Sequence, residues 1–98
     1  MTEVSRAASF LSTAIDFSGL TQKEIARRAG FSRPNVISMM KSGETKIPIS
    51  RVPGLARACG ITERVLLEIV LSEDHPEIWE VIKHTGCFDP RATKEDFL

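Results

Sequence analysis

The fold predicted for this chain depends on residues 21–41, TQKEIARRAGFSRPNVISMMK, which read as two short helices joined by a tight turn. Thr21 is a favourable N-cap, and Glu24 stands three positions later. That spacing is typical of a capping box, in which each side chain accepts a hydrogen bond from the backbone N–H of the other residue. Gly30 is expected to end the first helix, because glycine adopts the left-handed backbone of a helix C-terminus at little cost.

The second helix of this segment is predicted to begin at Ser32, whose hydroxyl can cap it, with Pro34 in the first turn. Three apolar residues recur at helical spacing and form the stripe expected to face inward: Val36, Met39 and Met40. Four polar residues remain for the outer face: Arg33, Asn35, Ser38 and Lys41. The second helix therefore has one face for packing and another for contacts outside the protein.

Small residues at Ala26 and Gly30 allow the two helices to cross closely at a steep angle. This is the helix-turn-helix pattern, whose second helix lies in the major groove of DNA. Over roughly residues 4–71 the chain resembles the phage-repressor branch of that family, the Cro/C1 or XRE-type regulators. The matching residues, at the family's spacing, are Gln22, Ala26, Gly30, Phe31, Val36 and Met39.

The resemblance implies an all-α, lambda-repressor-like five-helix DNA-binding domain, and the sequence adds a C-terminal helix at about residues 75–85. The length of 98 residues suits one domain, and no stretch alternates like a strand. We expect a single domain over residues 1–86, with the helix-turn-helix unit at 21–41, and a flexible tail over 87–98.

The remaining helices follow from caps and periodicity. A first helix is expected from Thr2, as N-cap, to Ser18, with Phe10 and Phe17 adding to the core. A fourth helix is predicted to run from about residue 49 or 50 to residue 59, and a fifth to begin after residue 62. The acidic pair Glu73 and Asp74 is interpreted as a solvated helix end.

The net charge of zero conceals two oppositely charged halves. Residues 1–60 contain nine basic and four acidic residues, a balance of +5, whereas residues 61–98 contain four basic and nine acidic residues, a balance of −5. The positive half includes the helix-turn-helix segment, as binding to phosphates requires. The acidic half is expected to point away from DNA.

Base readout is assigned to the N-terminal turn of the second helix of the unit. Arg33 is the first choice, because its guanidinium fork matches the two acceptors of guanine in the major groove. Asn35 and Ser38 are expected at base edges or phosphates, and Pro34 and Ile37 at a thymine methyl group.

Phosphate contacts complete the expected interface. The resemblance implies that Gln22 and the backbone N–H groups near it face a phosphate. Lysine and hydroxyl side chains then fix the register on the DNA backbone. The full set expected at the DNA is Gln22, Lys23, Ser32, Arg33, Pro34, Asn35, Ile37, Ser38, Lys41, Thr45 and Lys46.

The fifth helix is apolar over more than half of its circumference, which is more than one core can bury on a peripheral helix. We therefore expect a homodimer surface that includes Leu67, Leu71 and Trp79. Such a dimer reads a pseudo-palindromic operator in double-stranded DNA, with half-sites about one helical turn apart.

No catalytic set, zinc-ligand spacing or glycine-rich phosphate loop is present in the sequence, so no enzyme, metal, cofactor or small-molecule ligand is expected. Cys59 is expected as a buried thiol, and the absence of a signal or membrane segment predicts a cytoplasmic protein. The predicted function is a transcriptional regulator, a repressor of bacterial or phage type. The alternative is a protein-interaction module, an antitoxin-like or adaptor helix-turn-helix domain that binds another protein.

Overall fold

A computed structural model describes residues 5–86. Within that range the chain is helical and contains no strand, so the all-α prediction is confirmed. The elements are α1 Arg6–Ser18, α2 Gln22–Ala29, α3 Asn35–Ser42, the short 3₁₀ helix η1 Ile49–Arg51, α4 Val52–Cys59, α5 Glu63–Asp74 and α6 Pro76–Thr85. Thr2, Cys87 and the tail predicted for residues 87–98 lie outside the described residues.

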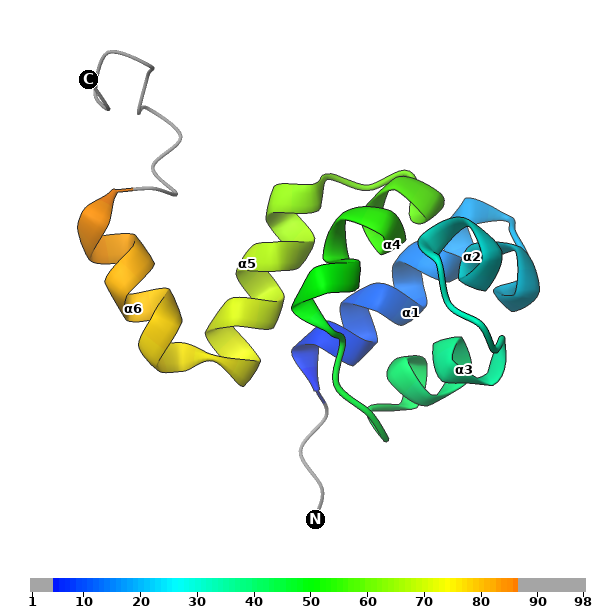
Figure 1. Ribbon diagram of the computed structural model, residues 1–98, viewed down its shortest axis with the longest axis horizontal. Helices are drawn as coiled ribbons and strands as arrows, with labels where there is room; N and C mark the ends of the chain where they lie inside the picture. The colour runs from blue at the N-terminus through cyan, green and yellow to red at the C-terminus, as the bar shows by residue number, and fades with distance from the viewer. Residues whose placement is uncertain (1–4, 87–98) are drawn as a thin grey trace.

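The first five α-helices surround one apolar core (Figure 1). Helix α1 packs against α3, α4 and α5, while α2 packs against α3 and α4. Eight side chains supply the fully buried centre of this core: Leu11, Ile25, Ile37, Met40, Val52, Leu55, Leu66 and Val70. Because these residues come from α1 to α5, α2 and α3 are held on the same scaffold.

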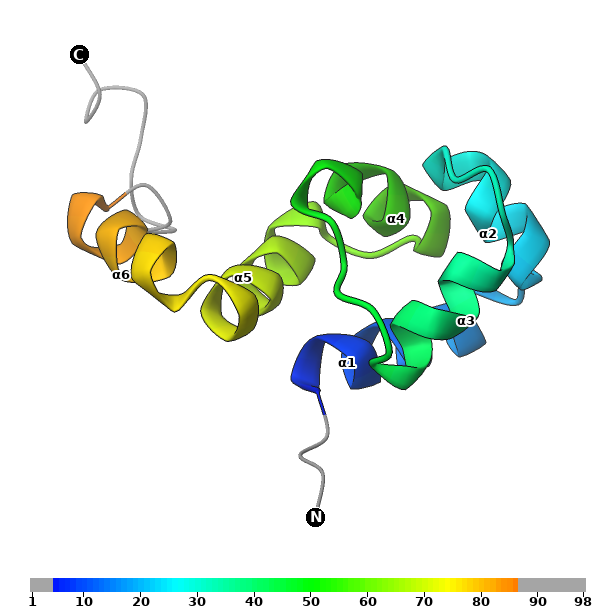
Figure 2. The ribbon, with the colours of Figure 1, turned by 60° about the horizontal axis from the view of Figure 1, so that its bottom comes forward.

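Helix α6 lies at the opposite end of the molecule from α2 and α3 in two views (Figures 1 and 2). It packs mainly against α5 and contains no buried residue. Ile78 and Val81 on this helix are 50% and 62% exposed. The C-terminal helix predicted by the sequence is therefore present, and its apolar face is largely uncovered.

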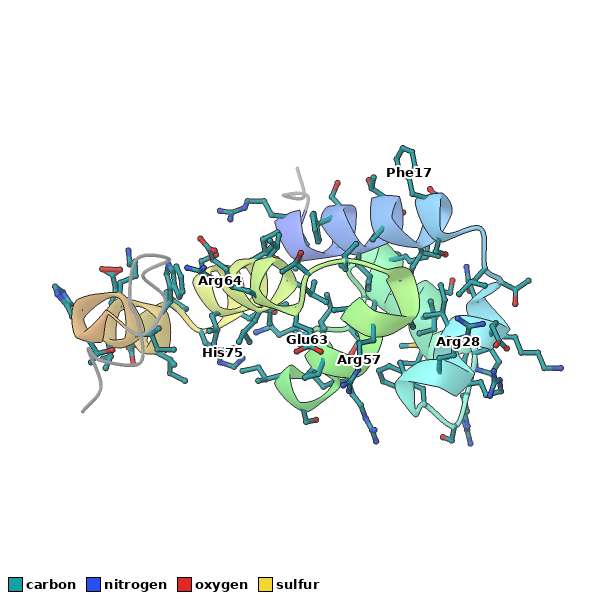
Figure 3. All side chains as sticks on the ribbon, turned by 90° about the horizontal axis from the view of Figure 1, so that it is seen from above. Phe17, Arg28, Arg57, Glu63, Arg64 and His75 are labelled. Carbon is teal, nitrogen blue, oxygen red and sulfur yellow. The ribbon has the colours of Figure 1, made fainter. Side chains whose placement is uncertain are left out.

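Phe17 does not join the core, contrary to the sequence-based expectation. Its side chain is 87% exposed and points away from α1 (Figure 3). Ile15, two positions earlier, is only 4% exposed. Two residues are separated by about 200° around an α-helix, so a helix that turns Ile15 inward must turn Phe17 outward.

Helices α2 and α4 approach closely at Gly54. A Cβ atom placed on Gly54 would lie 3.2 Å from both the Cα and the carbonyl oxygen of Ala29. That separation is shorter than an ordinary van der Waals contact, and both neighbours are backbone atoms that cannot rotate away. Gly54 thus permits the packing of α4 against the end of α2.

The start of α1 is capped by residues from two parts of the chain. Ser5, and not Thr2 as expected, is the N-cap, and its hydroxyl accepts a hydrogen bond of 3.1 Å from Ala8 N–H. The Glu73 carboxylate accepts hydrogen bonds from Ser5 Oγ (2.6 Å), Arg6 N–H (2.6 Å) and Ala7 N–H (3.1 Å). Glu73 is therefore not a solvated helix end as expected, because it joins the last turn of α5 to the first turn of α1.

Glu73→Gln is expected to lower the free energy of unfolding by about 1–2 kcal/mol at pH 7, because a charged acceptor at a helix N-terminus is replaced by a neutral one. Partial burial raises the pKa of the Glu73 carboxyl, but the hydrogen bonds from Ser5, Arg6 and Ala7 outweigh it, so the pKa lies below its ordinary value. The folded state thus favours the carboxylate, and its stabilisation is present above the ordinary carboxyl pKa and is lost as the pH falls through the folded-state pKa.

Urea unfolding of the wild type and the variant at pH 7 and at about pH 3 measures this difference. The difference in the free energy of unfolding between the wild type and the variant should be smaller at the lower pH, because the wild-type carboxylate then takes up a proton. Glu68→Gln, an exposed change on the same helix, is the matched control and should have little effect at either pH. Equal stability of the Glu73 variant and the wild type at pH 7 would contradict the assigned cap.

Candidate nucleic-acid interface

Helix α2 begins and ends at the residues that the sequence predicted. Thr21 caps α2, since its Oγ1 accepts a hydrogen bond of 3.1 Å from Glu24 N–H. Gly30 ends the helix in the left-handed region, with φ of 85°, and Phe31 N–H donates to the Ala26 carbonyl at 2.8 Å. These bonds satisfy backbone groups at both ends of α2 and reverse the chain toward α3.

The second half of the predicted capping box is absent, because the Glu24 carboxylate binds two arginines instead. Arg27 Nε donates to Glu24 Oε2 at 3.0 Å, and Arg28 Nε donates to Oε1 at 2.9 Å. Hydrogen bonds from Arg27 and then Arg28 lower the pKa of Glu24 to about 2. The positive charge on the outer face of α2 is therefore partly neutralised within the helix.

Helix α3 begins later than the sequence analysis expected. Its N-cap is Pro34, no side chain caps it, and Asn35 is its first residue. Ser32 is therefore not the cap. A residue that precedes proline is disfavoured in the helical region, which accounts for Arg33 lying outside the helix. Arg33 and Pro34 belong to the lead-in turn, where the Ile37 N–H donates to the Pro34 carbonyl at 3.0 Å.

The outer side of this region is open to solvent. Ser32, Arg33 and Pro34 in the turn and Asn35 and Ser38 in α3 are all exposed. The predicted outward placement of these five side chains agrees with their exposure, and α6 lies at the far end of the molecule from α3 (Figures 1 and 2).

Ile37 was expected at a thymine methyl group, and this expectation is wrong. Its side chain is fully buried, like that of Met40 one turn later, and both belong to the central core. Val36 and Met39 are only partly buried. Since the inward line of α3 passes through Ile37 and Met40, Ile37 is a packing residue that has no surface to offer a ligand.

The residues expected at phosphates occupy two regions. Gln22 and Lys23 lie in the first turn of α2, half-buried and exposed respectively. Thr45 and Lys46 lie in the loop after α3 and line a cavity of about 280 Å³ together with Glu73 and other residues at the ends of α1 and α5. Glu73, a residue of the acidic half, thus lies near Lys46, although the acidic half was expected to point away from the DNA-binding side.

Lys41, at the end of α3, is already engaged within the protein. Its Nζ lies 3.7 Å from the Asp16 carboxylate of α1, and its side chain is only 24% exposed. This distance is long for a hydrogen bond but allows an ion pair. Lys41 therefore ties the end of α3 to α1 in addition to any outside contact.

The residues expected at a dimer surface differ in their exposure. Leu71 is 4% exposed and lies in the molecule's interior, so it does not form an outer surface. Leu67 is partly buried against the core, and Trp79 is half-buried, with Lys83 Nζ 5.8 Å from its ring centroid. The exposed apolar residues of this region are Val65, Ile78 and Val81.

Arg51, the last residue of η1, reaches the turn between α2 and α3. Its guanidinium carbon lies 5.6 Å from the centroid of the Phe31 ring. The two residues are far apart along the chain, Phe31 in the turn after α2 and Arg51 in η1, so no local pattern could have indicated the contact.

The helix-turn-helix segment also lies within the part of the chain that matches a known protein family. The family model described as helix-turn-helix matches residues 18–66, which is half of the chain. Neither the curated proteins nor the solved structures gave a match. Over residues 5–86, no helix has the length and apolar character needed to cross a bilayer, and no group of three His, Cys, Asp or Glu side chains is arranged to hold a metal ion.

Proposed function

Because the chain belongs to the helix-turn-helix family of Cro/C1-type DNA-binding regulators, we propose that it is a sequence-specific repressor that inserts α3 into the major groove. The observation that carries this proposal is the two-sided character of α3. Ile37 and Met40 are fully buried on one side, whereas Asn35 and Ser38 are exposed on the other. A helix held by its inner side alone can present its outer side to base edges.

Base readout centres on the lead-in turn and the first turn of α3. Arg33 is exposed, and its guanidinium fork matches the O6 and N7 acceptors of guanine. Asn35 offers the amide pairing that suits adenine, and Ser38 lies one turn farther along the same face. The Pro34 ring is the apolar group for a thymine methyl, in place of the buried Ile37.

Phosphate contacts are assigned to Gln22 and Lys23 on one side of α3 and to Thr45 and Lys46 on the other. Arg27 and Arg28 are left out, because each already binds the Glu24 carboxylate. Lys41 is given a secondary role, since its ammonium group also faces Asp16. Two clamps of this kind fix the register of α3 without reading sequence.

Repression follows from occupancy. A domain of this size that covers a promoter blocks access of polymerase to the same DNA, and the protein then needs no effector to act. The half-site that each subunit reads is short, so a second subunit on a pseudo-palindromic operator supplies the remaining specificity.

Selection of bound fragments from the source genome tests this proposal. We expect a single enriched motif with two-fold symmetry, and an affinity for it that falls by about three- to four-fold per phosphate contact between 50 and 200 mM salt. No enriched motif, together with weak binding that is insensitive to salt, would refute DNA recognition and favour the protein-interaction alternative.

We place the dimer surface on α6 and include the exposed apolar side chain in the first turn of α5. Val65, Ile78 and Val81 are 42%, 50% and 62% exposed, and apolar groups this accessible gain free energy when a second copy covers them. Helix α6 lies at the end of the molecule away from α3 (Figure 1), so a contact centred on α6 leaves α3 uncovered.

Val81→Glu is expected to weaken dimerisation about ten-fold or more, because it places a charge in an apolar contact. Light scattering and sedimentation at micromolar concentration measure the mass of each protein. Phe17→Glu, an equally polar change at an exposed aromatic residue on α1, is the control and should leave the mass unchanged. A wild-type protein that is strictly monomeric at these concentrations would rule out this surface.

A further inference from the structure

The guanidinium group of Arg51 covers the turn that joins α2 to α3. Its carbon lies 5.6 Å from the centroid of the Phe31 ring, a distance within the range of a cation–π contact. A Cβ atom placed on Gly30 would lie 2.8 Å from Arg51 Nη1. One side chain from η1 therefore rests on the first two residues of the turn, Gly30 and Phe31.

This turn sets the direction in which α3 leaves α2. Gly30 holds the left-handed conformation, and Phe31 N–H donates back to Ala26. The Phe31 ring is half-buried and packs against the core. No side chain caps the start of α3. The position of this helix end therefore depends more on the packing around the Phe31 ring than it would in a capped helix.

We propose that Arg51 is a positioning residue for DNA recognition: it braces the turn through Gly30 and Phe31 and so holds Arg33 and Asn35 in the orientation that fits the major groove. Arginine suits this role better than lysine, because its planar guanidinium stacks on an aromatic face. The proposal rests on the proposed function, which supplies the DNA that α3 reads. It adds a residue of the α4 side of the molecule to the recognition unit.

The first test uses the protein without DNA. Amide chemical shifts and residual dipolar couplings are measured for the wild type, Arg51→Met, Arg51→Lys and Arg57→Met. Arg51→Met keeps the length of the stem and removes the cation. Arg57 is an exposed arginine on α4 whose guanidinium lies 3.8 Å from Glu63 (Figure 3), so Arg57→Met is matched in charge. We expect the amide chemical shifts and residual dipolar couplings of residues 30–38 to change in Arg51→Met, to change less in Arg51→Lys, and to stay as in the wild type in Arg57→Met.

The second test measures operator affinity over a range of salt concentrations for Arg51→Met, Phe31→Leu and the double variant. A positioning role predicts that Arg51→Met binds the operator about two- to five-fold more weakly. The salt slope, which is the slope of the logarithm of the affinity against the logarithm of the salt concentration, should be unchanged. It also predicts no further loss when Arg51→Met is added to Phe31→Leu, because the brace needs the ring. A role in folding alone would lower the melting temperature and leave affinity below that temperature unchanged.

Two further results would overturn the proposal. A salt slope smaller by about 0.9 in both Phe31 backgrounds would make Arg51 a direct phosphate contact. Amide chemical shifts and couplings of residues 30–38 that are unchanged in Arg51→Met would show that the conformation of the turn does not depend on the guanidinium group. If the wild type binds no DNA, the proposed function fails, and the amide measurements still decide whether Arg51 braces the turn.

Discussion

Replacing Ile37 by alanine is expected to lower the free energy of unfolding by about 2–5 kcal/mol. The side chain is fully buried in a core that it shares with Met40 and Leu11, so its removal leaves a cavity as well as a smaller apolar surface. Small domains have a total stability of about 5–15 kcal/mol, so this loss is a large share of it, and the melting temperature should fall by about 8 °C or more, at about 4–8 °C per kcal/mol. Thermal and urea unfolding measure the loss.

Ile49→Ala is the matched control, because it removes the same atoms from a side chain that is 39% exposed. It should cost far less. The comparison also separates the core position of Ile37 from the thymine contact that the sequence suggested. A variant with near wild-type stability and a selective loss of affinity at a thymine position would contradict the burial of Ile37.

Arg33→Ala is expected to weaken operator binding by about 1–3 kcal/mol and to relax specificity at one base pair. Arg33 is exposed in the turn before α3, so its truncation should leave the melting temperature nearly unchanged. Affinity for the selected operator and for its single-base variants, measured at one salt concentration, provides the test.

Arg57→Ala removes the same charge from an exposed site on α4, where the side chain is 74% exposed. It should lower affinity only through the general electrostatic term and should not change base preference. Equal losses in the two variants, with base preference retained in both, would mean that Arg33 contributes charge alone and does not read a base.

Most helix boundaries could be predicted because their signals are local. Thr21 caps α2 through a bond to a backbone group three residues away. Gly30, Gly43, Gly60 and Gly86 each follow a helix in the left-handed conformation. In such cases the groups that need a partner and the residue that supplies it lie within one turn of each other, so the order of residues contains the answer.

The start of α3, one of the boundaries that were predicted wrongly, involved two local rules in competition. Ser32 favoured an early cap, whereas Pro34 disfavoured a helical backbone at Arg33, and the proline rule prevailed. The identity of the inward residues also failed for α3. Val36, Ile37, Met39 and Met40 are all apolar, so periodicity permits more than one inward line, and only the position of α1 against α3 selects Ile37 and Met40.

The sequence by itself determined the helical class, the helix-turn-helix segment and the outward placement of Arg33, Asn35 and Ser38, because caps, glycines and apolar spacing act over a few residues. The tertiary structure decided which neighbours each helix meets: Glu73 at the start of α1, Gly54 against Ala29, and Arg51 over Phe31. Each of these contacts joins residues of different structural elements, and its existence depends on how the helices pack, which no local pattern specifies.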